Sequence, residues 1–290
     1  MGPFMKCGRH RTRATGGIIA FLLLAAGISR PAQGAFISLQ LDAAAVVSNR
    51  SAFIPVRVAN QGDEAAHAVQ LAARFEEQTA VSPIRAKLGV NAMLEEILTL
   101  TNMPAGTGTY CVVLTTRYAD ANHYPFSSVV PVPLISGISN EWEQVLGTMA
   151  PVRLKQKATL QVHLKTRLTQ DVDTRLRLLL PDEIACERAE QNVMLFTGQD
   201  RKIVFEVDNF SGRPGSRYAV FALVDYDTAG RHHALIVPGN IFIAAAQSIW
   251  VTQTALWISI IVILITGALL VQLGSRRTKA IADRHGETDR

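Results

Sequence analysis

The side chains that could perform chemistry are mainly histidines and carboxylates in the C-terminal half. They are Asp225, Asp227, His232 and His233, with His123 further upstream. Imidazole nitrogens and carboxylate oxygens are ligands that Zn²⁺ accepts. Adjacent residues of a strand point to opposite faces, so His232 and His233 cannot readily chelate one ion. We therefore expect an exposed final hairpin here and predict no metal site.

A hydrolase would show its nucleophile or metal ligands in a local motif. The chain has no G-x-S-x-G sequence, which would set a serine on a strand-to-helix turn. It also has no H-E-x-x-H sequence, which would place two histidines on one face of a helix. A catalytic triad of a serine, a histidine and an acid that come together only in the folded chain cannot be recognised from their spacing in the sequence. We predict no catalytic and no cofactor-binding residues, and we expect neither enzyme activity nor a cofactor.

Cysteine usage bears on redox chemistry and on crosslinking. The chain contains Cys7, Cys111 and Cys186. There is no C-x-x-C pair, so a thiol redox role has no support. Cys111 and Cys186 fall in different predicted domains, so we expect buried or weakly reactive free thiols. A disulfide closing a loop of about 75 residues is the alternative in an oxidising compartment.

An uncharged stretch near the C-terminus is a candidate membrane anchor for the rest of the chain. Residues 255–273 carry no charge and precede a basic tail. Nineteen helical residues span roughly 28 Å, close to the thickness of the hydrocarbon core of a bilayer. Trp250 and Trp257 lie where indole rings favour the headgroup region. We predict a transmembrane helix over 250–273 and a tail over 274–290.

The N-terminus has the pattern of a secretory leader. A basic segment precedes a short apolar run over residues 16–28, and Ala32-Gln33-Gly34 supplies the small residues that a signal peptidase reads. We predict a signal peptide over 1–34, with an uncleaved signal anchor as the alternative. The positive-inside rule then places residues 35–248 outside the cytoplasm and the C-terminus inside it. The expected topology is a type I single-pass protein of the inner or plasma membrane.

The basic charge of the chain comes from its leader. The sequence has 29 basic and 24 acidic residues, and residues 1–34 hold five basic residues and no acid. The remaining chain has 24 of each and is formally neutral. A neutral mature chain lacks the basic footprint of a nucleic-acid binder, so we expect no nucleic-acid partner.

Alternation of apolar and polar residues indicates an all-β extracytoplasmic region. Residues 53–60 alternate and end in the turn-forming cluster Gln61-Gly62-Asp63. Residues 159–168 place Leu160, Val162 and Leu164 on one face, and residues 172–180 and 202–207 look similar. Period-two patterning with turn signals about every ten residues is typical of antiparallel sandwiches.

A partial internal repeat divides this region in two. Residues 108–120 align with residues 216–228 at an offset of 108, which superimposes Tyr110 on Tyr218 and Tyr118 on Tyr226. A repeat at the spacing of one domain favours duplication.

We therefore predict one sandwich over 35–135, a linker over 136–151 and a second sandwich over 152–244. Within the linker, Trp142 either packs between the domains, which we favour, or belongs to a short capped helix.

The two segments resemble the Ig-like sandwich modules of bacterial envelope proteins, of the cell-adhesion-related or alpha-galactosidase-associated type. The likeness covers 36–135 and about 152–244, and it rests on Val58-Ala59-Asn60-Gln61-Gly62 and on Tyr118-Ala119-Asp120. It is a superfamily-level likeness that transfers no catalytic residue. It implies tandem Ig-like sandwiches that act as spacers or as binding surfaces.

The second domain has an uneven distribution of charge. Residues 153–177 are mainly basic and residues 182–208 mainly acidic. On different faces they would create a basic surface for anionic lipid or for an acidic partner. On neighbouring strands they would pair and cancel, which is the arrangement that we expect.

These features favour a non-enzymatic, membrane-anchored adaptor or scaffold of an envelope complex that binds protein through strand edges or loops. A membrane-anchored glycan-binding module is the alternative. It would need a ring-sized groove lined by Tyr118, Tyr124 or Trp142.

Overall fold

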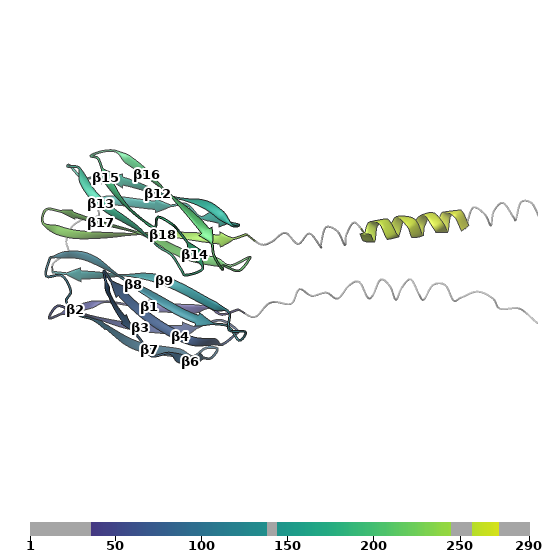
Figure 1. The fold of residues 1–290 in the computed structure, drawn as a ribbon, viewed down its shortest axis with the longest axis horizontal. Coiled ribbons are helices and arrows are strands. Elements are labelled where there is room, and N and C mark those ends of the chain that lie inside the picture. Colours follow the sequence, from purple (N-terminus) through teal and green to yellow (C-terminus); the bar gives the residue numbers. More distant parts are fainter. Residues whose placement is uncertain (1–35, 138–143, 245–256, 273–290) are drawn as a thin grey trace, which may run out of the picture.

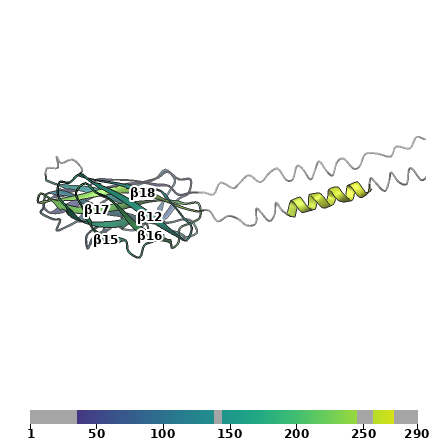
Figure 2. The ribbon, with the colours of Figure 1, turned by 90° about the horizontal axis from the view of Figure 1, so that it is seen from above.

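The computed structural model describes residues 36–137, 144–244 and 257–272. The first two segments form two β-sandwiches that lie side by side, and the third is a helix (Figure 1; Figure 2). The predicted signal peptide and tail, together with Trp142 of the linker, lie outside the described residues. The all-β sandwich class is confirmed.

The N-terminal sandwich consists of two sheets. Its outer sheet has β3 at the centre, with β7 on one side and β1 and β2 on the other. In its inner sheet, β8 lies between β4 and β9, and β5 and β6 extend β4. The strands are β1 Leu39–Ala43, β2 Val46–Ser48, β3 Ser51–Asn60, β4 Ala66–Phe75, β5 Gln78–Val81, β6 Arg85–Leu88, β7 Met93–Leu100, β8 Gly108–Ala119 and β9 Pro125–Ser136.

A proline breaks the first strand of the outer sheet into β1 and β2. Pro55 has no N–H group, so it cannot donate a hydrogen bond to a neighbouring strand. Its carbonyl accepts the amide of Ala44, which shows that its backbone faces the first strand. The pairing of β1 ends at Ala43 and that of β2 begins at Val46, on either side of this position.

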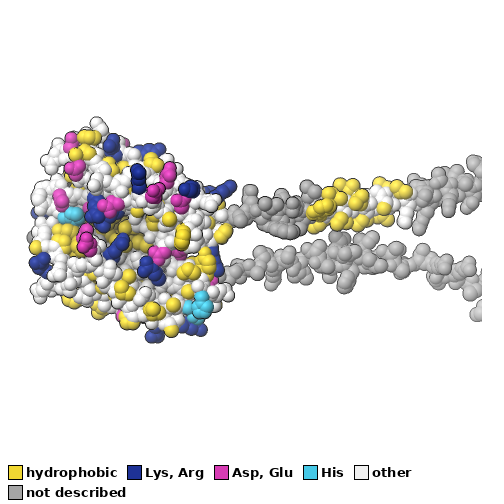
Figure 3. All heavy atoms as spheres, in the orientation of Figure 1, with side chains coloured by type: hydrophobic (Ala, Val, Ile, Leu, Met, Phe, Trp, Pro, Cys, Tyr) yellow, Lys and Arg dark blue, Asp and Glu magenta, His cyan; other side chains and the backbone are white. Residues whose placement is uncertain are grey.

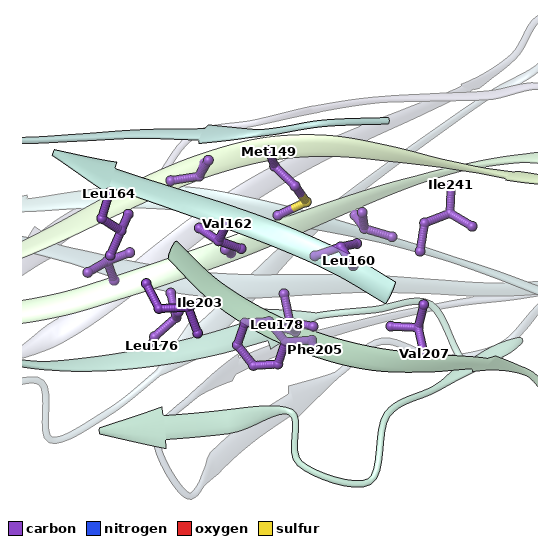
Figure 4. Packing of buried hydrophobic residues seen from close by; sticks show 14 of the residues in the cluster. Met149, Leu160, Val162, Leu164, Leu176, Leu178, Ile203, Phe205, Val207 and Ile241 are labelled. Atoms are coloured by element: carbon purple, nitrogen blue, oxygen red, sulfur yellow. The ribbon is translucent and has the colours of Figure 1, made fainter. Parts of the chain in front are cut away.

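The C-terminal sandwich repeats this plan. Its outer sheet has the order β10-β12-β16-β14, and its inner sheet has the order β15-β13-β17-β18 with β11 on β18. Figure 4 shows side chains of β12, β13 and β16, among them Leu160, Leu176 and Phe205, gathered between the sheets. The strands are β10 Val145–Met149, β11 Val152–Leu154, β12 Lys157–Thr166, β13 Val172–Leu179, β14 Ile184–Ala185, β15 Glu190–Leu195, β16 Asp200–Asn209, β17 Arg217–Thr228 and β18 Arg231–Ile243.

The predicted repeat corresponds to equivalent strands. β8 and β17 each lie in the inner sheet of their sandwich and lead into its last hairpin. Tyr110 and Tyr218 are both buried near the start of these strands. The offset of 108 therefore aligns the same structural position in the two sandwiches.

The two inner sheets pack face to face. Cys111 and Val113 of β8 and Val129 of β9 form a small buried cluster with Leu179 of β13 and Leu223 of β17. Polar groups surround this cluster, because the ion pairs Arg117–Asp182, Arg175–Glu76 and Arg213–Asp120 cross between the sandwiches. The resulting body has four layers of sheet (Figure 1).

Close backbone approach joins the sandwiches at β8 and β18. The amide of His232 donates to the carbonyl of Thr107, and His232 pairs with Gly108 in parallel orientation. A Cβ atom on Gly108 would lie 2.1 Å from the carbonyl oxygen of His232, and the φ of Gly108 is +143°. Only glycine fits this crossing without displacement of the backbone.

The chain enters and leaves this body at one end, which we call the proximal end. Phe36, the first described residue, lines a pocket together with Ser216. The carbonyl of Ser216 in turn accepts the amide of Ile243, the last residue of β18. The opposite end, with the β17–β18 turn, is the distal end (Figure 1; Figure 2).

The predicted transmembrane segment is described only in part. A helix covers residues 257–272, sixteen residues that span about 24 Å. No helix in the described part of the chain combines the length and the apolarity needed to cross a bilayer. The helix predicted over 250–273 is therefore not found, and residues 250–256 and 273 lie outside the described residues.

Candidate functional site

The histidines and carboxylates near the C-terminus support the contact between the sandwiches. The ring of His232 stacks on Tyr110 with a centroid distance of 4.6 Å, and its Nδ1 lies 3.0 Å from Oδ1 of Asp227. Its Nε2 lies 3.5 Å from Oδ1 of Asp225, which also pairs with Arg177. Burial lowers the pKa of His232, but the hydrogen bonds to Asp225 and Asp227 outweigh it, so the pKa is raised overall.

The remaining histidines are held elsewhere. His233 lies opposite Tyr226 in the ladder and stacks on its ring at 4.9 Å, on the other face of β18 from His232. His123 lies in the β8–β9 turn at the proximal end, where its amide donates to the carbonyl of Asp120. Within the described residues, no three His, Cys, Asp or Glu side chains are placed to hold a metal ion.

Both described cysteines are free thiols. Cys111 is buried between the sandwiches, and this burial raises the pKa of its thiol to about 12. Cys186 is half-buried, and burial is also the main cause that raises its pKa. A thiol with a raised pKa carries little thiolate at neutral pH, so neither residue is a ready nucleophile.

The tyrosines of the predicted glycan groove each pack a ring face against a neighbouring side chain. Tyr118 stacks on Phe126 with a centroid distance of 5.5 Å. The guanidinium of Arg213 lies 4.3 Å above the ring of Tyr124, whose hydroxyl donates to the carbonyl of Ser211. A sugar ring stacks on an open aromatic face, and these two tyrosines are engaged in contacts within the protein.

The outer face of the N-terminal sandwich carries an apolar strip. The strip consists of Val46, Phe53, Pro55 and Ile97, which point away from the core on β2, β3 and β7. Val46 lies directly opposite Phe53, and Pro55 lies directly opposite Ile97. The exposed fractions of Phe53 and Ile97 are 42% and 68%. Neighbouring exposed apolar side chains of this kind mark interaction surfaces.

Charged residues border the strip on the same face. Arg57 lies between Asp42 and Glu95 in the register, and its Nε donates to Oε1 of Glu95 at 2.8 Å. A hollow of about 540 Å³ runs from these charges to Pro55 and Ile97. An apolar centre with a charged rim is the usual composition of a protein-binding surface.

β7 also presents a free strand edge beside the strip. In the described part of the chain, the ladders pair β7 with β3 alone. The backbone of Pro55 faces β1 and β2, so its partner Ile97 directs its own N–H and C=O away from β3. An unpaired edge of this type can accept the strand of a partner.

The sequence contained a signal for this surface that periodicity alone did not reveal. On β3, Phe53 and Pro55 occupy positions that face away from the core, where polar residues are usual. On β7, Ile97 occupies such a position between Glu95 and Thr99. Once the register places these residues side by side, single exposed apolar side chains become a continuous strip.

The known proteins that resemble this chain do so only weakly. No family model and no curated protein matches the chain. Among solved structures it is similar to native E. coli alpha-2-macroglobulin (9% identity, TM-score 0.31, 72% of this chain and 17% of that chain). It is also similar to red sea bream transglutaminase (13% identity, TM-score 0.27, 81% of this chain and 34% of that chain). A third similar structure is the YadV chaperone (9% identity, TM-score 0.29, 70% of this chain and 98% of that chain). Likenesses at these values carry no argument about function.

Proposed function

We propose that the chain is a non-enzymatic, membrane-anchored adaptor or scaffold of a cell-envelope complex. Its binding surface is the outer face of the N-terminal sandwich. The observation that supports this proposal is the apolar strip of Val46, Phe53, Pro55 and Ile97 beside the free edge of β7. Together they offer a partner both apolar area and backbone hydrogen bonds.

The packing of the two sandwiches supports the same role. The inner sheets are covered by each other, so the outer sheet of the N-terminal sandwich is one of the two outermost layers. The cluster around Leu223 and the three ion pairs at its rim hold this layer in a set orientation. An adaptor needs a surface presented in a defined direction, and this arrangement supplies one.

The membrane anchor of the proposal is a helix over 250–273 with the topology of a type I protein. The described helix over 257–272 supplies its apolar centre. Residues 250–256, which precede this helix, carry no charge. A helix continued through them would reach the length that a bilayer requires.

The test is affinity purification of the full chain, crosslinked in its native membrane and analysed by mass spectrometry. We expect a reproducible membrane or extracytoplasmic protein partner. The double substitution Phe53→Ser and Ile97→Ser should reduce its recovery about tenfold or more, since central apolar contacts dominate binding. Val204→Ser is the matched control, because Val204 is 46% exposed on the C-terminal sandwich. Equal recovery of the partner with the unmodified chain, the double variant and the Val204→Ser control would contradict the proposed surface.

A further inference from the structure

The proximal end of the body exposes aromatic rings. Phe210, in the turn between β16 and β17, is 78% exposed, and Phe36 is 57% exposed. Phe242, next to the end of β18, is 38% exposed. Exposed rings at the end of a body that faces a bilayer fit the headgroup region, where amphipathic and aromatic side chains partition.

Two arginines lie among these rings. Arg213 is 45% exposed and lies over Tyr124 and Phe126, and one of its guanidinium nitrogens is 3.1 Å from Asp120. Arg217 lies over Phe242 and donates from Nε to Asn240. Each guanidinium has five N–H donors, so both keep donors for a further ligand. Figure 3 shows Lys and Arg side chains beside hydrophobic ones at this end of the body.

A pocket of about 320 Å³ lies between the sandwiches at the same end. Its wall includes Arg213, Arg217, Phe126 and Tyr218. Tyr218 is buried, and its hydroxyl lies near the backbone of Arg213 and the side chain of Ser216 but has no hydrogen bond of full geometry among the described residues. A buried hydroxyl donor beside two guanidinium groups suits an oxyanion such as a phosphate.

The two carboxylates at this pocket, Asp120 and Glu64, already have partners in the protein. Burial raises the pKa of Asp120, but the amides of Tyr124 and Asn122, which donate to its carboxylate, together with Arg213 outweigh burial and lower the pKa overall. Glu64 accepts the amide of Ala121. Arg213 is thus shared with Asp120, whereas Arg217 forms no ion pair among the described residues and is the guanidinium more open to a ligand.

The covalent connection to the helix brings this end close to the membrane. Twelve residues, 245–256, separate the C-terminal sandwich from the described helix. Even fully extended, they reach at most about 40 Å. If the helix is inserted, the end at which β18 terminates therefore lies within about 40 Å of the bilayer.

We propose that the proximal end binds the surface of the anchoring membrane, with Arg213 and Arg217 bound to the phosphates of anionic phospholipids and Phe210 inserted among the headgroups. This inference rests on the membrane anchor of the proposed function. It adds that the sandwiches lie against the bilayer and do not stand away from it on a tether.

The test uses the full chain in nanodiscs of phosphatidylcholine alone and of phosphatidylcholine with phosphatidylglycerol. Hydrogen–deuterium exchange is followed in peptides that cover residues 209–218. We expect slower exchange in the anionic discs. The double substitution Arg213→Gln and Arg217→Gln should remove most of the difference, since each basic residue near an anionic surface is worth about a fivefold change in association. Phe210→Ser should reduce the difference without altering any ion pair, and Val204→Ser on the C-terminal sandwich should leave the difference intact.

The outcomes separate this inference from the proposed function. Equal exchange in both lipid compositions would overturn the binding of anionic lipid, and so would protection that survives the two arginine substitutions. If the chain does not enter the discs, the anchor of the proposed function fails. Flotation of the same chain with phosphatidylglycerol vesicles then tests the binding of anionic lipid by itself. Co-flotation would support this binding, and the absence of co-flotation would overturn it. Partner recovery with the Phe53→Ser and Ile97→Ser variant tests the adaptor surface separately.

Discussion

Ser127 of the N-terminal sandwich donates two hydrogen bonds to Glu183 of the C-terminal sandwich. The backbone amide of Ser127 lies 2.7 Å from Oε1 of Glu183, and its hydroxyl lies 2.7 Å from Oε2. The same hydroxyl accepts the amide of Asp182. Glu183 is only 2% exposed, so these bonds replace the water that the carboxylate loses. The pair joins the sandwiches beside the apolar cluster of the inner sheets.

The substitution Ser127→Ala should therefore destabilise the protein. It leaves one carboxylate oxygen of buried Glu183 and the amide of Asp182 without their partner, which costs about 1–3 kcal/mol. Denaturant unfolding of the full chain in detergent measures this change. The control is Ser128→Ala, because the Ser128 hydroxyl is buried without a hydrogen-bond partner in the described part of the chain. Equal destabilisation by both substitutions would contradict the role of the Ser127–Glu183 pair.

The stability of the protein should depend on the protonation of His232. Because its pKa is raised in the folded state, the protonated ring contributes stability that is fully present below the ordinary value of 6.5. That contribution is lost as the pH rises through the raised pKa. Thermal unfolding at about pH 5.5 and pH 8.5 should show this loss as a lower stability at the higher pH. His232→Asn should remove most of this difference between the two pH values. Asp227→Asn should flatten it in part. An unchanged pH profile in both variants would exclude His232 as the titrating group.

The crossing of β8 and β18 should tolerate no side chain. Gly108→Ala would place a Cβ against the backbone of His232 in a positive-φ conformation, so we expect a loss of about 3 kcal/mol or more. Gly198→Ala is the matched control, since Gly198 also has a positive φ but has open space around it, and it should cost about 1 kcal/mol. Chemical denaturation of both variants compares the two losses. If they were similar, the close approach at Gly108 would not be a constraint.

The two described cysteines should differ in reactivity. Cys111 is buried between the sandwiches and has a pKa of about 12, so a maleimide should modify it only after unfolding. Cys186 is half-buried and should react slowly in the folded protein. Peptide mass spectrometry after timed labelling separates the two sites. Modification of Cys111 as fast as Cys186 in the native state would show that the sandwiches separate in solution.

The strands could be predicted because their side chains alternate. On β3, Ile54, Val56 and Val58 are buried as the pattern requires, and Leu160, Val162 and Leu164 behave in the same way on β12. These strands lie in the outer sheets, where one face is exposed, so the period of two is visible in the sequence.

The packing of one sandwich on the other could not be predicted in this way. Residues 110–114 and 221–224 are apolar at consecutive positions because β8 and β17 are covered on both faces there. Such a run predicts a strand covered on both sides but does not identify what covers it. The partner sheet is fixed by contacts such as Cys111 with Leu223, which lie far apart in the sequence.

The candidate surface was missed for a related reason. Phe53 and Ile97 are 44 positions apart and come together only through the register of β3 with β7. The expectation of binding through strand edges or loops did not identify which edge. Of the helix predicted over 250–273, the structure describes residues 257–272, and these are helical throughout.

Site-specific photo-crosslinking can show whether a protein partner binds the outer face of the N-terminal sandwich. A benzophenone amino acid replaces Ile97 in one version of the full chain and Val204 in another, and each is irradiated in native membranes. We expect a crosslinked protein from position 97 that is absent or much weaker from position 204. The same adduct from both positions, or from position 204 alone, would contradict binding at this face.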